Sequence, residues 1–164
     1  MYERITTGND PDFGDMDDMV SFFRGMLYGD SRIGNNMNVK PNLPSFASMF
    51  KFHIINNKTI AELTDKNFII NEVQDALDLM ADLGSQGYDR MIICERNLAK
   101  DFFDLKTGLV GEILQKFSNY KVKLAIVGDF SKYTSKSLRD SIRESNRGKM
   151  IFFAEDLQSA LLRL

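Results

Sequence analysis

Residues 123–153 read KLAIVGDFSKYTSKSLRDSIRESNRGKMIFF, and this stretch decides the fold. Its first part, Lys123–Gly128, is apolar enough to be buried on both faces, as the central strand of a sheet is. A polar helix is predicted from about Ser135 to Asn146, and a second apolar strand follows at Met150–Phe153. Two buried strands joined by a helix indicate a right-handed crossover in a parallel sheet.

The alternation of strands and helices continues on both sides of this stretch. The further predicted elements are a hairpin at 54–63 with an Asn-rich turn, a helix from the capping-box pattern at 71–74 to Gly84, a strand at 91–94, and helices at about 107–119 and 157–164. The sequence therefore predicts an α/β fold. We expect a small mixed, mostly parallel sheet of four or five strands with flanking helices.

The N-terminal arm, residues 1–48, differs in character from the single α/β domain predicted at 49–164. All three prolines lie in the arm, and residues 30–48 have the composition of a linker. Residues 16–28 predict one amphipathic helix, whose apolar face consists of Met19, Phe22, Phe23, Met26 and Leu27. We expect this face to be buried against the same chain or a second copy, and we expect residues 49–164 to fold without the arm.

Composition excludes several classes of function. No apolar run approaches the roughly 20 residues of a membrane helix, and residues 1–10 lack the features of a secretory signal. Cys94 is the only cysteine, which suits a cytoplasmic protein, and His53 is the only histidine, which leaves no two-histidine metal site. The net charge of −2 and the absence of aromatics among basic residues make nucleic acid an unfavoured partner.

Charge is nevertheless unevenly distributed along the chain. Residues 53–112 have a net charge of −5 and residues 116–149 a net charge of +6. Arg139, Arg143 and Arg147 are four residues apart on one predicted helix face. Such a face is usually solvated, and the alternative is a contact surface for an acidic partner, including the arm of another copy.

Two runs resemble a known bacterial family. They are QDALDLM at 74–80 and FFDLKTGLVGEILQKFSNYKVKLAIVGDFSKYTSKSLRDSIRESNRG at 102–148. From about Met49 onward the chain resembles the family named domain of unknown function 4180, whose name implies no function. Residues 1–48 have no counterpart in that pattern.

A more distant resemblance is to sulphate-transporter and anti-sigma-factor-antagonist domains. These domains are small non-enzymatic modules in which a strand leads into an Asp-Ser-Ser-Gly turn that opens a helix, and the serine before the glycine is a phosphorylation switch. Asp104, Thr107 and Gly108 occupy a similar place here, with one extra residue and with threonine for serine. The resemblance implies a protein partner and makes Thr107 the candidate switch.

The same turn has a simpler interpretation in terms of helix capping. Oxygens of Asp104 and Thr107 can accept hydrogen bonds from free N–H groups at the start of the helix. The two interpretations are compatible. Phe102 and Phe103 precede the turn, and if one ring belongs to the core the other remains a candidate contact for a partner.

A ligand-binding alternative rests on the loops that follow the strands. Ligands of open α/β sheets bind at the carboxyl ends of strands, and Asp129, Ser131 and Lys132 follow the central strand. The loop lacks the glycines of a nucleotide-binding loop. Nothing in the spacing brings together the strand-end carboxylates of Glu95, Asp104, Asp129 and Glu155, so we expect neither a metal nor a cofactor.

We interpret the chain as a cytoplasmic regulatory or protein-interaction module without catalytic residues. Its partner is a protein that the sequence does not identify, and a homodimer is compatible with the arm. The alternative is an enzyme or sensor that binds a small ligand or anion with the strand-end loops.

Overall fold

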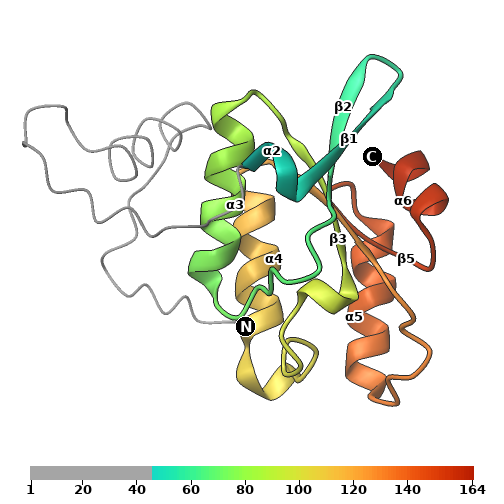
Figure 1. Ribbon diagram of the computed structural model, residues 1–164. Helices are drawn as coiled ribbons and strands as arrows, with labels where there is room; N and C mark the ends of the chain where they lie inside the picture. The colour runs from blue at the N-terminus through green and yellow to red at the C-terminus, as the bar shows by residue number, and fades with distance from the viewer. Residues whose placement is uncertain (1–45) are drawn as a thin grey trace, which may run out of the picture.

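A computed structural model of the chain describes residues 46–164 (Figure 1). The arm helix predicted at 16–28, with its apolar face, lies outside the described residues. The elements in chain order are α2 (Phe46–Met49), β1 (Phe50–Ile55), β2 (Lys58–Leu63), α3 (Val73–Ser85), β3 (Arg90–Cys94), α4 (Leu109–Asn119), β4 (Lys123–Val127), α5 (Lys136–Arg147), β5 (Ile151–Ala154) and α6 (Leu157–Arg163).

The five strands form one sheet in the order β1-β2-β3-β4-β5. β1 pairs with β2 in the antiparallel direction, and the other three pairs are parallel. The predicted mixed, mostly parallel sheet is therefore confirmed. Because right-handed crossovers that all step in one direction place their helices on one face, α3, α4 and α5 share a face of the sheet.

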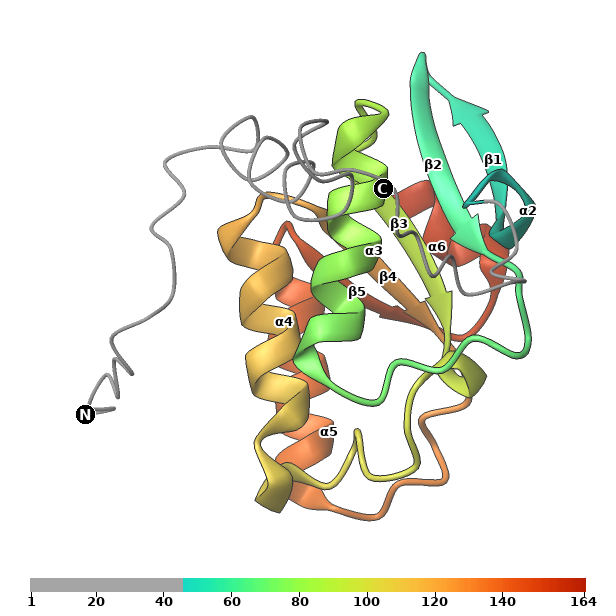
Figure 2. The same cartoon turned by 60° about the vertical axis from the view of Figure 1, so that its left-hand side comes forward.

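Two hydrophobic cores lie on opposite faces of the sheet. The larger core combines Met91, Ile93, Leu124 and Ile126 of the strands with side chains of α3, α4 and α5, such as Phe117. The smaller core combines alternate strand residues with the short helix α6 and consists of Ile60, Ile92, Ala125, Phe152, Ala154, Ala160, Leu161 and Leu164. Figure 2 shows α3 and α4 side by side in front of the sheet.

The predicted hairpin is present, and it is longer than expected at its start. Asn56 and Asn57 connect Ile55 to Lys58 and have positive φ angles of 50° and 62°. Two-residue hairpin turns need such angles, and asparagine tolerates them better than most residues. β1 extends back to Phe50, and residues 46–48, which their composition predicts as linker, belong to the short helix α2.

The helix boundaries correct the predictions by one or two residues. α3 continues past Gly84 to Ser85, and its capping box joins Glu72 with Asp75 rather than using Asn71 as the cap. α4 begins at Leu109 because a 3₁₀ turn at Leu105–Thr107 precedes it. Ser135 accepts a hydrogen bond from the Leu138 N–H and is the N-cap of α5.

The outer edge of β5 is closed by a side chain of α5. The Asn146 amide donates to the Phe153 carbonyl and accepts from the Phe153 N–H, at 3.1 and 2.7 Å. The side chain thus makes the two hydrogen bonds that another strand would make there. Unpaired strand edges invite association with other chains, and this contact blocks one such position.

None of the helices within residues 46–164 combines the length and the apolar character that crossing a bilayer requires.

We predict that Asn146→Asp lowers the free energy of unfolding by about 1–3 kcal/mol, because the carboxylate places an acceptor against the Phe153 carbonyl. Asn119→Asp is the matched control, since Asn119 is an exposed residue in the last turn of α4. Both variants place a negative charge near the end of a helix, which costs about 0.3–1 kcal/mol. Urea denaturation measures the difference, and equal losses would contradict the edge-closing role.

Candidate functional site

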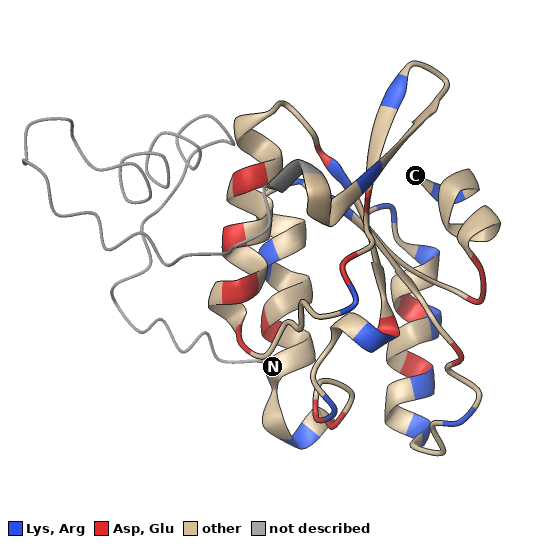
Figure 3. Cartoon of the chain, in the orientation of Figure 1, with Lys and Arg blue, Asp and Glu red and all other residues tan. Residues whose placement is uncertain are grey.

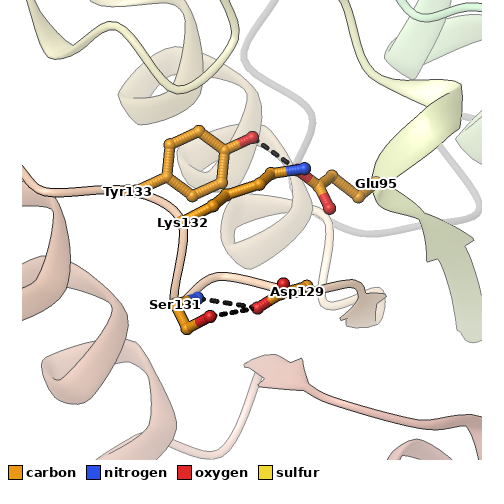
Figure 4. A network of polar contacts seen from close by, with 5 residues as sticks. All are labelled: Glu95, Asp129, Ser131, Lys132 and Tyr133. Atoms are coloured by element: carbon orange, nitrogen blue, oxygen red, sulfur yellow. Dashed lines mark hydrogen bonds and ion pairs between the residues drawn. The ribbon is translucent and has the colours of Figure 1, made fainter.

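The carboxyl ends of β3 and β4 bring together polar side chains that we call the strand-end cluster: Glu95, Asp129, Ser131, Lys132 and Tyr133 (Figure 4). Glu95 directly follows β3, and the other four lie in the loop after β4. The Tyr133 hydroxyl donates to Glu95 Oε1 at 2.5 Å, and Lys132 Nζ lies 2.5 Å from the same oxygen. Parallel strands end at the same edge of a sheet, which is why residues 38 positions apart meet.

Glu95 is mostly buried, and its position depends on Gly128. The side chain of Glu95 is 14% exposed, and a Cβ at Gly128 would lie 2.6 Å from both Glu95 Cβ and Oε2. Any side chain at residue 128 would therefore displace Glu95. The glycine is required by close approach, since its φ angle is not in the left-handed region.

Asp129 and Ser131 form a local turn at the exposed side of the cluster. Asp129 Oδ1 accepts hydrogen bonds from the Ser131 hydroxyl at 2.6 Å and from the Ser131 N–H at 3.0 Å. These bonds hold the pKa of Asp129 below its ordinary value. Asp129, Ser131 and Lys132, the predicted ligand-loop residues, are thus exposed but already bonded to neighbours within the cluster.

Phe102 and Phe103 are buried, which corrects the prediction that one ring is left for a partner. The Phe103 ring packs on Phe102 and Tyr133, with ring centroids 4.9 and 4.7 Å apart. Phe130 continues the stack toward Phe153 of β5 at 5.2 Å. This aromatic stack joins the loop after β3 to the loop after β4.

Residues 104–108, which we call the helix-start turn, directly follow the two phenylalanines of the aromatic stack. Asp104 Oδ1 accepts from the Lys106 N–H, and the Thr107 hydroxyl donates to the Asp104 carbonyl while it accepts from the Leu109 N–H. Gly108 has a φ of 74°, a conformation that favours glycine. The Thr107 oxygen thus accepts the first N–H of α4, whereas Asp104 caps the 3₁₀ turn before it and not α4 itself. Asp104, Thr107 and Gly108 are all exposed, so the switch interpretation stays a prediction.

The arginines of α5 form an exposed basic row, Arg139, Arg143 and Arg147. Figure 3 shows that basic and acidic segments alternate along this helix. Arg143 lies 3.6 Å from Asp140, which reduces the repulsion along the row. Pairs at such exposed positions contribute little to stability.

His53 and Cys94 lie on strands outside the strand-end cluster. His53 Nε2 is 2.7 Å from Glu62 Oε2 on the neighbouring strand, and both side chains are about 15% exposed. Burial raises the pKa of the Cys94 thiol, and the charge of Glu62 raises it further although Arg96 opposes this. The protonated thiol is a poor nucleophile.

The described residues contain no group of three or more His, Cys, Asp or Glu side chains arranged to hold a metal ion. The acids Glu95, Asp104, Asp129 and Glu155 are therefore not brought together as a metal site. Two open cavities lined by described residues lie away from the carboxyl edge. One lies between the ends of α4 and α5, and the other between the hairpin turn and α6.

Sequence reasoning missed the pairing of Glu95 with Tyr133. The available signal was the position of both residues just after neighbouring buried strands. A tyrosine and a carboxylate there form a hydrogen bond only if the loop after β4 turns back over β3. The loop is held over β3 by the aromatic stack, in which Phe103 packs on Tyr133. This contact joins residues that are far apart in the sequence.

The model of one protein family, described as "Domain of unknown function (DUF4180)", matches residues 55–164. This agrees with the resemblance found on residues 74–80 and 102–148. No curated protein and no solved structure matches the chain. The resemblance to anti-sigma-factor-antagonist domains therefore has no support from a solved structure.

We predict that Gly128→Ala lowers the free energy of unfolding by about 1–3 kcal/mol, because the added Cβ displaces Glu95 from Tyr133 and Lys132. Gly111→Ala in α4 is the matched control, since a Cβ there meets no atom within 4 Å. Alanine is the better helix former by about 1 kcal/mol, so the control should stabilise the protein. Equal effects in urea denaturation would show that Gly128 is not required by the contact with Glu95.

We also predict that Tyr133 ionises well above pH 10. Burial raises the pKa of its hydroxyl, and the hydrogen bond to Glu95 and the charge of Glu95 raise it further. Because the folded pKa exceeds the unfolded value of about 10, the stabilising contribution is complete below pH 10 and is lost as the pH rises above it. Titration at 295 nm of the wild type, Tyr133→Phe and Glu95→Gln measures this.

In that titration, Glu95→Gln should shift the ionisation of Tyr133 to lower pH. The difference between the wild type and Tyr133→Phe isolates this tyrosine from the other four. A Tyr133 that ionises at pH 10 in the wild type would contradict the geometry of the strand-end cluster.

Proposed function

The chain belongs to the DUF4180 family, and we propose that it is a non-catalytic regulatory module that binds a protein partner in the cytoplasm through the helix-start turn. The observation that carries the proposal is the pairing of polar side chains at the carboxyl edge of the sheet. Ligands of α/β sheets usually bind at this edge. Here the Glu95 carboxylate accepts a hydrogen bond from Tyr133 and forms an ion pair with Lys132, and the Asp129 carboxylate accepts a hydrogen bond from Ser131.

This pairing disfavours the alternative of an enzyme or a small-ligand sensor. A ligand at this edge would have to displace Lys132 from Glu95, which would leave a mostly buried carboxylate with one partner fewer. The two open cavities described above lie elsewhere. The strand-end cluster is thus better suited to holding the two loops together than to chemistry.

The helix-start turn is the exposed feature that this arrangement supports. Phe102 and Phe103, which directly precede the turn, are buried in the core. Asp104, Thr107 and Gly108 of the turn are exposed to solvent. Gly108 has open space where a side chain would lie, so a partner can approach the backbone closely. A phosphate on Thr107 would gain from the start of α4 and would be repelled by Asp104, which makes the site sensitive to a change in charge.

We predict that Thr107→Glu weakens partner binding at least about tenfold while changing stability by less than about 1 kcal/mol. Ser137→Glu is the matched control, because Ser137 is an exposed hydroxyl residue in the first turn of α5. Immobilised wild-type, Thr107→Glu and Ser137→Glu chains are exposed to a lysate of the source organism, and bound proteins are quantified by mass spectrometry.

The proposal requires a protein that the wild type and Ser137→Glu retain and that Thr107→Glu loses. Purified partner and chain then give the change in affinity, and thermal unfolding gives the change in stability. If Thr107→Glu retains every protein that the wild type retains, the helix-start turn is not the binding surface.

A further inference from the structure

A groove between the ends of two helices lies far from the strand-end cluster. It is lined by Leu114, Gln115, Ser118, Ser145, Gly148, Lys149, Met150 and Ile151, and its volume is about 430 Å³. We call it the helix-end groove. Leu114 and Met150 are half-buried and Ile151 is buried, so its floor is apolar, whereas Ser118 and Lys149 at its rim are exposed.

The surroundings of the helix-end groove are basic. Residues 145–149, which include three that line the groove, contain two bases, Arg147 and Lys149, and no acid. Lys149 lines the groove, and Arg147 is an exposed residue at the end of α5 that continues the basic row. An occupant with an apolar face and negative charge would complement both the floor and the rim.

The chain itself contains a segment with these properties. Residues 10–18 include five aspartates and no Lys or Arg, a net charge of −5. The predicted helix at 16–28 begins within this segment and continues with its apolar face of Met19, Phe22, Phe23, Met26 and Leu27. An acidic start joined to an apolar stripe is the pattern of a helix that binds in a groove.

The linker is long enough to bring this segment to the groove. Residues 29–45 separate the segment from Phe46, where α2 begins, and extended chain of that length spans roughly 55 Å. The sheet between β1 and β5 is four strand spacings wide, roughly 20 Å. A short tether also gives the segment a high effective concentration at its own domain, which favours binding in the same chain over binding to a second copy.

We propose that residues 10–28 dock in the helix-end groove of their own chain. The apolar face of the predicted helix packs on Leu114, Met150 and Ile151, and the aspartates of residues 10–18 lie beside Arg147 and Lys149. The groove is thus a binding site for an acidic amphipathic helix, and residues 10–28 of the same chain are the segment that binds there. This inference does not depend on the helix-start turn being a partner site.

Hydrogen exchange of the full chain, read by mass spectrometry, tests the proposal. Amides of residues 16–28 should be protected at least tenfold in the wild type. Charge reversal by Arg147→Glu with Lys149→Glu should remove most of this protection, and so should Ser118→Trp, which fills the groove. The control pair Lys58→Glu with Lys66→Glu changes the same charge at exposed positions away from the groove and should leave the protection intact.

Charge exchange makes the test specific to this contact. Adding Asp17→Lys and Asp18→Lys to the Arg147→Glu, Lys149→Glu chain should restore the protection. Three results would overturn the proposal: unprotected amides at 16–28 in the wild type, protection that survives both groove variants, or protection that disappears on dilution. The last result would mean that the segment binds a second copy.

Discussion

The handedness of the three parallel crossovers determines most of this structure. Each crossover steps to the next strand in the same direction. Parallel crossovers are right-handed as a rule, so α3, α4 and α5 are expected on one face, and side chains of all three helices do lie in the larger core. The opposite face is left to one short helix, α6, and the small side chains of Ala125 and Ala154 lie in that core. The same constraint places the loops after β3 and β4 side by side at one edge.

Because the loops after β3 and β4 are neighbours, the strand-end cluster can hold them together. A mostly buried carboxylate is stable only with hydrogen-bonding or charged partners, and Glu95 has a hydroxyl and an ammonium group on one oxygen. Gly128 provides the space for the carboxylate, and the stack of Phe103 on Tyr133 holds the hydroxyl in place. The polar groups therefore join the loops that follow β3 and β4.

The sheet and its direction could be predicted from sequence because they depend on local patterns. Buried runs such as Lys123–Val127, and helices with regular apolar spacing, are visible without knowledge of the fold. The roles of single residues were less accessible. Phe103 packs on rings more than 25 positions away, and the closing of β5 by Asn146 depends on how α5 lies beside the strand. The residue type of an asparagine or a phenylalanine does not by itself determine whether its side chain is exposed or buried.

The consecutive order of the strands has a consequence for biosynthesis. Each new strand pairs with the strand made just before it, so no earlier pair has to open to admit a later one. The hairpin and each following helix–strand unit can therefore add to a growing edge while the ribosome is still translating, a vectorial route with little exposure of unpaired strands. The exception is the smaller core. It requires Leu161 and Leu164, which are among the last residues described, so one face of the sheet stays uncovered until they have been made.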